Sequence, residues 1–432
     1  MPLARSILPI ASLLVGMCLL LAAGGLHSIL IPIRGALEGF STYAIGIIGA
    51  GYALGFTAGC VLVPHVVRRV GHVRTFSALV SALGANVLLC GIFPNAWFWI
   101  LLRVLAGFSF AGCYMIAESW LNERVSNAQR GTIFSFYAIA TQGGLMAGQY
   151  ALVVAPPERD TLFMLGAILY ALAVVPTAIS KAQSPAPLTR VKLDVRTIFT
   201  RSPVAFMGSI LSGIISSAWM SFAPVYGQGV GLSNTAIASL LAVAMLGSVV
   251  LQLPIGRLSD VIDRRYAMVL VCAMGAGLGT LLTTLTLSGS FGWLFYGAIA
   301  AYGAAIYSIY AVVVAHGNDY ASPDDFVETA SALLILYGAG TMIGPLVTAQ
   351  LIDSFGVTGM FTTTTVAHAA LGVYALYRTF RRAAPDQSQD FAQLPAGRTQ
   401  TPETYALDPR ADAEEPAGLP ELPVIAVKRT EF

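Results

Sequence analysis

The sequence predicts an all-α integral membrane protein with twelve transmembrane helices in two parallel six-helix bundles. The first observation is that 56% of the 432 residues are hydrophobic and only 11% are charged, whereas a soluble domain carries about a quarter charged residues. The second is that apolar runs reach the roughly 20 residues that span a bilayer. The third is that these runs form two sets of six. This composition argues against a soluble enzyme, a nucleic-acid-binding protein and a disordered scaffold.

The predicted spans are continuous apolar runs. The first set covers 8–33, 42–64, 75–93, 96–117, 131–154 and 162–180, and the second covers 203–226, 235–255, 267–288, 291–315, 329–352 and 358–377. Because these runs do not alternate polar and apolar residues as membrane β-strands do, we expect helices. The first run follows Arg5 and is longer than a signal-peptide h-region of about 7–15 residues, so we interpret it as a retained helix.

Polar stretches divide the chain into parts. The stretch between the two sets of spans contains Pro185 and Pro187, and from about Pro385 the chain becomes rich in proline and acidic residues. The latter stretch has too little apolar content to build a core. We therefore expect an N-terminal six-helix bundle over 1–180, a cytoplasmic linker over 181–202, a C-terminal six-helix bundle over 203–380 and a disordered cytoplasmic tail over 381–432.

Positive charges predict the orientation. With both termini placed inside, the outer loops hold only Arg34 and Arg159, and Arg103 alone lies within a span. All other Lys and Arg residues then fall on the inner side. Because cytoplasmic loops are enriched in Lys and Arg, we expect a multi-pass protein of the plasma (inner) membrane with both termini in the cytoplasm.

The two sets of spans align as an internal duplication. At a shift of about 192 positions Gly55 meets Gly247, and from the fourth span a shift of about 196 brings Gly107 onto Gly303. The later shift also superimposes Asn122–Glu123 on Asn318–Asp319, Gly144 on Gly340, and Gly148 on Gly344. A repeat with an even number of spans keeps its orientation, which predicts parallel halves that pivot about a site between them.

The loop after the eighth span carries a specific motif. It reads GRLSDVIDRR from Gly256 to Arg265 and resembles the G-x-L-[SA]-D-R-x-G-R-[KR] loop of the major facilitator superfamily. The resemblance implies the major facilitator fold and a charge network that closes the cytoplasmic side. Val261 replaces the first Arg of the motif, and Asp263 replaces its second Gly. The gating residues implied here are Gly256, Asp260, Asp263, Arg264 and Arg265.

The corresponding loop of the first half departs further from this motif. When it is aligned on Gly71, Arg68 occupies the Asp position and Pro64 occupies the first Gly position. This departure predicts an altered charge network, in which we include Arg68, Arg69 and Gly71 as gating candidates.

A second resemblance covers residues 103–149. Arg103-x-x-x-Gly107 is similar to the fourth-helix Arg motif of the superfamily. The stretch 118–122, which reads ESWLN, together with Arg130–Gly131 and Gly148–Gln149, resembles the YcaD-like branch. The resemblance implies secondary transport, but it defines no substrate.

The eleventh span contains Gly340-x-x-x-Gly344-Pro345. This resembles a motif in the fifth helix of drug/proton antiporters, although here it lies in the second half. Small residues permit close helix approach, and a proline kinks a helix. A gating role and plain helix packing are both open interpretations.

Polar side chains within spans predict the lining of a cavity, because such residues are costly in a membrane. In the first half these are His27, Arg103, Gln142 and Gln149. We expect Arg103 to offer a cation to an anionic group or to orient a coupling proton; the alternative is that it only holds helices together.

The second half contributes aromatic candidates. Trp219 falls opposite His27 under the repeat, and Tyr307 and Tyr310 lie three residues apart on one helical face. Tyr302 and Tyr337 add further hydroxyl-bearing rings. Together they suit an amphipathic or aromatic substrate better than a small ion.

Glu118 lies at the inner end of the fourth span. It could carry a proton or brace the cytoplasmic gate against Arg residues. No Asp or Glu falls at the middle of a span, so proton coupling would have to use His27, Glu118 or a relay modulated by Arg103.

The sequence as a whole predicts a secondary active transporter that moves a small organic solute by alternating access. A facilitative uniporter, a non-transporting membrane sensor on the same fold and a membrane-embedded enzyme are the alternatives. The chain has neither a Walker loop nor an HExxH motif, and its five cysteines lack metal-binding spacing. We therefore expect no catalytic residue, metal or other cofactor. The expected partners are a small-molecule substrate, the lipid bilayer and, if transport is coupled, protons; we expect a monomer that binds no nucleic acid.

Overall fold

The computed structural model describes residues 11–124, 130–179, 195–321, 326–382, 391 and 400–406. Within these ranges every regular element is a helix. This follows from the apolar composition, because a chain inside a bilayer must satisfy its backbone hydrogen bonds within the spanning segment. Part of the predicted linker, 181–194, lies outside the described residues.

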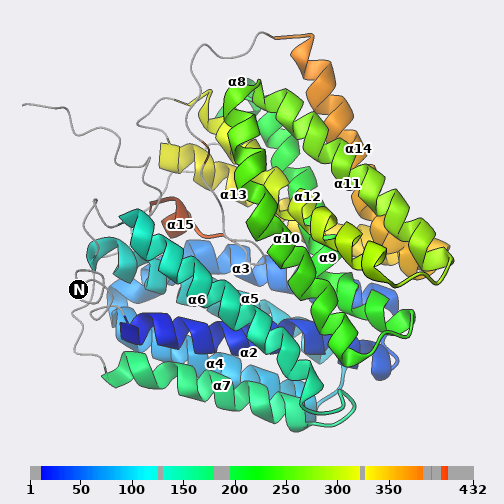
Figure 1. Ribbon diagram of the computed structural model, residues 1–432. Helices are drawn as coiled ribbons and strands as arrows, with labels where there is room; N and C mark the ends of the chain where they lie inside the picture. Colours follow the sequence, from blue (N-terminus) through cyan, green and yellow to red (C-terminus); the bar gives the residue numbers. More distant parts are fainter. Residues whose placement is uncertain are drawn as a thin grey trace, which may run out of the picture.

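The helices follow one another in two series (Figure 1). The first series is α2 (Ala11–Leu37), α3 (Thr42–Val70), α4 (His72–Ile92), α5 (Ala96–Arg124), α6 (Arg130–Tyr150), η3 (Ala151–Val153) and α7 (Thr161–Ile179). The second is α8 (Val195–Arg201), α9 (Pro203–Gly229), α10 (Asn234–Val261), α11 (Arg264–Leu287), α12 (Trp293–Asn318), α13 (Phe326–Phe355), η5 (Gly356–Thr358) and α14 (Gly359–Thr379). The short helix α15 (Pro402–Ala406) lies in the predicted tail.

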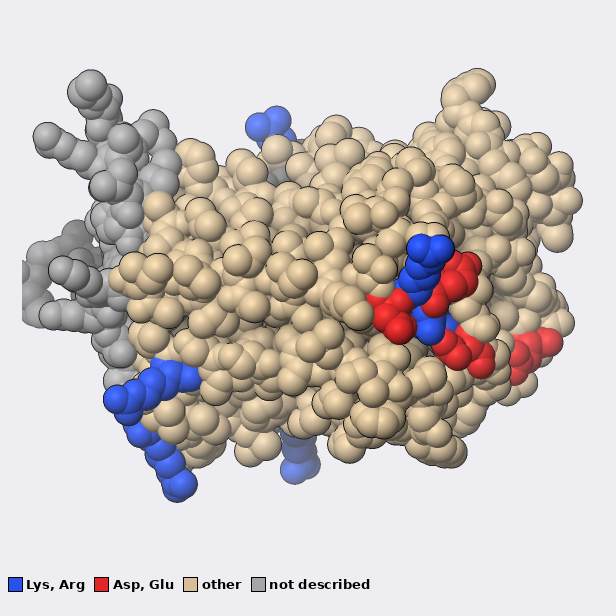
Figure 2. Space-filling view, turned by 90° about the horizontal axis from the view of Figure 1, so that it is seen from below, with Lys and Arg blue, Asp and Glu red and all other residues tan. Residues whose placement is uncertain are grey.

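Several of these helices can cross a membrane. In the described part of the chain, ten stretches are long and apolar enough, and one of them, 328–379, contains both α13 and α14. Helix α6 is not among these stretches, so the count of twelve spans stays a prediction. Figure 2 shows a broad face almost without charge, with most charged side chains toward its two ends. The protein is therefore an all-helical, multi-pass membrane protein.

The two series form two groups of helices with the same internal contacts (Figure 1). In the first group α2 packs on α6 and α3 on α5; in the second α9 packs on α13 and α10 on α12. A Cβ atom at Gly107 would overlap the carbonyl oxygen of Tyr52, and one at Gly303 would overlap that of Ala244. Tyr52 and Ala244 are themselves related by the shift of about 192 positions. The matching contacts support the duplication, while the predicted domain boundaries stay a prediction.

Helix starts repeat in the same way. Ser41 and Ser233, which the duplication superimposes, each cap a helix by accepting a backbone hydrogen bond, from Ala44 at 3.2 Å and from Ala236 at 3.3 Å. A serine in this position satisfies an N–H group that has no partner within the helix. The sequence repeat thus reproduces local structure as well as packing.

The two groups meet along α3 and α13 and along α2 and α9. A Cβ atom at Gly46 would lie 2.8 Å from the carbonyl oxygen of Pro345, and one at Gly49 would lie 2.6 Å from the Ser221 hydroxyl oxygen. The hydroxyl groups of Tyr150 and Ser239 are 3.0 Å apart. All these contacts lie toward the predicted outer end, so the groups are joined there. We call these contacts the outer seam.

The described part of the tail differs from the predicted disorder. Residues Pro402–Ala406 form α15, which contacts α5 and α13. Gln400, Thr401, Glu403 and Thr404 are buried. The polar composition indicated no core of its own, but these residues pack against the two helix groups instead. We call Phe391 and residues 400–406 the docked tail.

Candidate functional site

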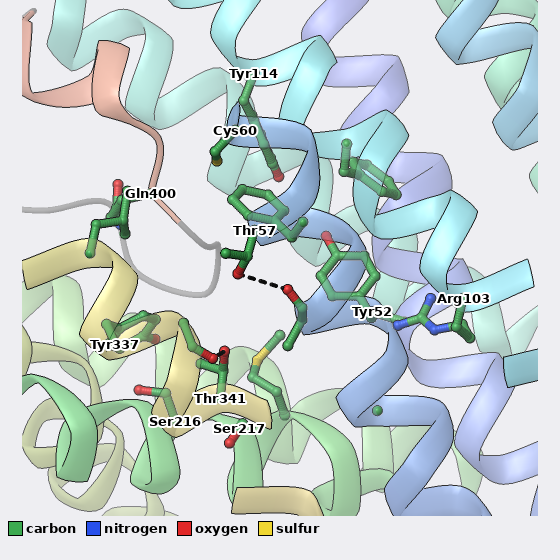
Figure 3. A pocket seen from close by; sticks show the side chains of 18 of the residues that line it. Tyr52, Thr57, Cys60, Arg103, Tyr114, Ser216, Ser217, Tyr337, Thr341 and Gln400 are labelled. Atoms are coloured by element: carbon green, nitrogen blue, oxygen red, sulfur yellow. Dashed lines mark hydrogen bonds between the residues drawn. The ribbon is translucent and has the colours of Figure 1, made fainter. Parts of the chain in front are cut away.

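A cavity of about 410 Å³ lies between the two helix groups. Its wall is mostly apolar and aromatic, with hydroxyl groups set into it, as is typical of small-molecule sites. Figure 3 shows side chains from both groups pointing into it. The first group contributes Tyr52, Phe56, Thr57, Cys60, Arg103 and Tyr114, and the second contributes Ser216, Ser217, Ser221, Tyr307, Tyr337 and Thr341.

Helical spacing places these side chains on the cavity face. Tyr52, Phe56 and Cys60 on α3 lie four residues apart, so they form one stripe. The Thr57 hydroxyl donates to the carbonyl of Ala53 at 3.0 Å. Because such back-bonding satisfies the hydroxyl donor within the helix, this polar group is retained at low cost and its oxygen can still accept a bond.

Arg103 projects from α5 into the cavity wall. Its guanidinium carbon lies 4.5 Å from the centre of the Tyr52 ring, a cation–π distance. Within the described residues the guanidinium has neither a hydrogen bond nor an ion pair, and its Nε is buried without a partner. The predicted location of Arg103 at the cavity therefore agrees with the structure.

The other three polar candidates of the first half do not line the cavity. His27 is buried between α2 and α7, with its Nδ1 3.2 Å from the Tyr170 hydroxyl. Gln149 is buried where α6 meets α2, close to Gly25. Gln142 is half-buried on α6. The physical reason is that α6 packs its glycine face against α2. The polar side chains are therefore held in contacts within the first group and do not reach the cavity.

Some aromatic candidates of the second half line the cavity and others do not. Tyr307 lines the cavity, and its hydroxyl lies 3.5 Å from the Met220 sulfur. Tyr310 and Tyr337 also line it, with ring centres 4.3 Å apart. Trp219 is instead fully buried in the core, with its ring centre 5.7 Å from that of Tyr302. Trp219 is therefore not a cavity residue.

The predicted loop from Gly256 to Arg265 is mostly helical, because α10 continues to Val261 and α11 begins at Arg264. This junction of α10 and α11 holds a buried ion network. The Arg264 Nε donates to Asp319 at 2.7 Å, and both side chains are 2% exposed. Arg264 also bonds Asp260 at 3.0 Å and the Ser259 hydroxyl at 2.7 Å. The contact with Asp319 ties the start of α11 to the end of α12. The motif residues thus form the kind of charge network that the resemblance implies.

Asp263 shows what replaces the second motif glycine. Its carboxylate accepts a bond from the Arg265 backbone at 2.9 Å and caps α11. It also pairs with the Arg265 guanidinium at 2.6 Å. Burial opposes ionisation, but these bonds and the charge of Arg265 hold the pKa of Asp263 below its usual value. Asp263 therefore caps α11 with a charged side chain at the position where the motif has a glycine.

The junction of α3 and α4 is built differently. Gly71 ends α3 with φ at +89°, a left-handed conformation that favours glycine. Arg68 and Arg69 are exposed and form no ion pair within the described residues. Their gating role stays a prediction.

Gly340 and Gly344 bring α13 against α9. A Cβ atom at Gly340 would overlap the carbonyl oxygen of Ile210, and one at Gly344 would lie 2.7 Å from that of Ile214. The equivalent Gly148 meets the carbonyl oxygen of Ala22 in the first group. The motif thus brings the two helices into close contact, with Pro345 at the outer seam; its gating role stays a prediction.

Glu118 is fully buried on α5 and does not line the cavity. Its carboxylate accepts hydrogen bonds from the hydroxyl groups of Thr401, Thr404 at 2.8 Å and Tyr137 at 3.4 Å. Two of these partners belong to the docked tail, which the prediction of a proton carrier or an Arg-paired brace did not include.

Sequence reasoning missed most of the cavity wall, including Tyr52, Thr57, Cys60 and Ser216. A stripe at every fourth residue of α3 was visible, but the same stripe also describes ordinary helix packing. The serines of α9 were a better signal, because small hydroxyl groups cluster there in an apolar span.

Comparison with known proteins agrees with this architecture. The sequence model of the Major Facilitator Superfamily matches residues 13–239 and 205–411. Two curated relatives, both called uncharacterized MFS-type transporter YcaD, come from Escherichia fergusonii and from a strain of Escherichia coli. The first is 25% identical over 350 residues, the second 25% over 355, and each match covers 80% of this chain and 90% of the relative.

Solved structures share the fold. The nucleoside transporter NupG has a TM-score of 0.71 at 15% identity, with 87% of this chain and 100% of that chain covered. A bacterial homologue of the human lysosomal transporter Spinster, inward-facing and occupied, has a TM-score of 0.68 at 15% identity, with 87% and 96% covered. The duplicated helix groups, the cavity between them and these matches lead to one conclusion: the chain belongs to the major facilitator superfamily of membrane transporters and is YcaD-like.

Proposed function

We propose that this protein is a secondary transporter that carries a small organic solute across the inner membrane by alternating access. The observation that carries the proposal is the position of the cavity, which is lined by both helix groups. Two similar bodies that rock about a shared site expose it first to one side and then to the other.

The outer seam supports this movement. Its contacts join glycine backbone to small side chains or to a carbonyl group, as at Gly46 with Pro345 and Gly49 with Ser221. Such contacts can separate without breaking a charge network. When the seam opens, the loops at the predicted cytoplasmic end must approach each other, and we propose that Gly71, Gly256 and the Arg264 network act there.

Facilitated diffusion is the second candidate. Among the described residues that line the cavity there is no Asp or Glu, so a coupling proton has no carboxylate carrier in contact with solute. His27 and Glu118 lie outside the wall, whereas the imidazole of His65 is part of it. Coupling would therefore require His65 or an indirect connection to Arg103.

Flux through proteoliposomes containing the purified full-length protein tests the proposal. The panel comprises drugs, sugars and organic acids, each measured with and without a pH gradient. Saturable flux supports a transporter, and acceleration by the gradient supports proton coupling over uniport. Binding without flux would indicate a sensor, and chemical conversion of a compound would indicate an enzyme.

A further inference from the structure

The cavity wall carries an unbalanced positive charge. Among its described residues Arg103 is the one with a permanent charge, and none is an acid. Apolar walls strengthen the field of such a group because they exclude water. The described part of the wall therefore favours anions over cations.

The Arg103 guanidinium is not consumed by structural contacts. Arg264, in contrast, is saturated by Asp319 and two further side chains. The described residues offer Arg103 only the ring of Tyr52, at 4.5 Å. A charge within a membrane is costly and is usually paired or functional. An unpaired guanidinium in a cavity wall is thus available to a ligand carboxylate, which it can bind in bidentate geometry.

The rest of the wall suits an apolar body. Tyr52, Phe110, Tyr114 and Tyr307 present rings, and the volume of about 410 Å³ is that of a site for one small organic molecule. Building on the proposed transport function, we propose that the substrate is an amphipathic organic monoanion. Its carboxylate pairs with Arg103, and its aromatic or aliphatic body lies against the tyrosine rings.

Matched ligand series test this substrate class on the purified full-length protein. Each series contains an aromatic or alkyl monocarboxylate, its primary amide and the corresponding amine, and binding is measured calorimetrically. We expect each bound carboxylate to bind about 10- to 100-fold more tightly than its amide, as a charged hydrogen-bonded pair provides. In Arg103→Gln this difference should disappear, whereas Arg103→Lys should keep part of it because the charge remains. Arg34→Gln, at the outer end of α2, is the matched control and should leave it unchanged.

The outcomes separate the substrate class from the transport function. Amides or amines that bind as tightly as the acids, or a carboxylate preference that survives Arg103→Gln, would overturn the monoanion. Flux of neutral or cationic compounds in the same proteoliposomes would support transport but contradict the monoanion as substrate class. Carboxylates that bind through Arg103 without any flux would support the monoanion as ligand but contradict transport.

An independent observation concerns the docked tail at the predicted cytoplasmic end of the cavity. Gln400 and Pro402 line the cavity, and Figure 3 shows Gln400 on the same side of the view as Tyr337 and above it. Helix α15 contacts α5 of the first helix group and α13 of the second (Figure 1). One short segment therefore touches both groups where the cavity ends.

Specific bonds hold this segment. The hydroxyl groups of Thr401 and Thr404 both donate to the Glu118 carboxylate, the latter at 2.8 Å. All three side chains are buried, and hydrogen bonds to a charged group are stronger than those between neutral groups. Docking thus satisfies a buried carboxylate that would otherwise require other partners.

Phe391 makes a second attachment. Its backbone N–H donates to the Asp260 carboxylate at 2.9 Å. Its ring occupies the space above Gly256, where a Cβ atom would overlap the ring. The docked tail therefore engages the end of α10 in one group and Glu118 in the other.

We propose that the docked tail is an autoinhibitory strap. In place, it narrows the route of the solute to the predicted cytoplasmic side and occupies space that must close when the groups rock. Release of the tail opens the cavity and permits the movement.

Removal of the two hydroxyl donors tests the strap in the full-length protein. In a background where Cys60 is the remaining cysteine, we compare Thr401→Val/Thr404→Val with the exposed control Thr200→Val. Maleimide labelling of Cys60, which lines the cavity, should become about tenfold faster in the double variant, as the loss of one charged hydrogen bond already predicts. Solute flux should rise as well. Phe391→Ala provides a second release variant that leaves Glu118 and its hydroxyl partners intact.

Unchanged labelling in both release variants would overturn the strap. Faster labelling with slower flux would also overturn it, because the tail would then support transport instead of restraining it. Labelling needs no flux, so this result remains decisive even if the transport proposal fails.

Discussion

The two equivalent helix junctions at the predicted cytoplasmic end differ in how they are stabilised. At the α10–α11 junction Arg264 is buried against Asp319 and Asp260. At the α3–α4 junction the aligned position holds His72, whose ring centre lies 6.4 Å from that of Trp120. The two repeats share the backbone arrangement here but not the charges. The second helix group therefore contains its own ion network, whereas the first contacts the docked tail through Glu118.

The same division applies to the cavity. The glycine contacts at Gly107 and Gly303 are equivalent, yet the position of Arg103 is occupied in the second group by Ile299. The packing frame is thus symmetric, while the charge that can select a solute is supplied by one group. This comparison predicts which substitutions should act equally in both groups and which should not.

The largest effect is expected from joining the two groups at the outer seam. A Cβ atom at Gly49 would lie 3.3 Å from that of Ser221, near the range for a disulfide. In a cysteine-free background, oxidation of Gly49→Cys/Ser221→Cys should abolish flux, and reduction should restore it. The single variants are the controls. Full flux in the cross-linked protein would contradict movement of the groups against each other.

Alanine at the equivalent glycines tests the symmetric frame. Gly107→Ala and Gly303→Ala should each strongly reduce the yield of monodisperse protein, because the new Cβ would overlap a backbone oxygen and overpacking costs about 1–3 kcal/mol or more. Gly143→Ala, with open space around its Cβ position, should have little effect. Size-exclusion chromatography measures this. Strongly unequal losses would argue against equivalent packing.

Charge removal tests the asymmetric loops. Asp319→Asn should lower the free energy of unfolding by about 3–5 kcal/mol, because it leaves a buried Arg264 with an incomplete network. Arg68→Gln, at an exposed position, should change it by no more than about 0.5 kcal/mol. Thermal or denaturant unfolding in detergent measures both. Equal effects would show that the exposed loop also depends on its charges.

The smallest effect concerns the pH dependence of tail docking. Burial, and then the charge of Glu118, raise the pKa of Glu403 to about 7; Glu118 on α5 is the charged neighbour among the described residues that contributes. Docking is strongest at a pH below the ordinary Glu pKa of about 4.3, because Glu403 is then protonated in both the docked and the undocked tail. As the pH rises, Glu403 ionises first in the undocked tail, so docking weakens. The effect levels off above about pH 7, near the pKa of Glu403 in the docked tail. Relative to Glu403→Gln at the same pH, Cys60 labelling should therefore accelerate by at most tenfold per pH unit in this range; the comparison cancels the rise in reactive thiolate with pH, which both proteins share.

Much of the molecule was predictable from the sequence. Apolar runs indicated an all-helical membrane protein, and the spacing of Gly55, Gly107 and their counterparts indicated the duplication. The motif from Gly256 to Arg265 predicted a charge network at one loop. Each of these features is local or periodic along the chain, so it is visible without knowing which helices touch. Arg103 was also predictable, because a charge within a span has few structural explanations.

Tertiary structure decided which polar groups face the cavity. His27, Gln149 and Trp219 fit the pattern of functional residues, but helix rotation buries them within one group, while Tyr52 and Ser216 face the space between groups. The docking of Thr401 and Thr404 on Glu118 joins residues more than 280 positions apart. Composition along a chain records what can be buried in a membrane; which buried side chain meets which depends on how the helices are rotated and paired, and no local pattern contains that information.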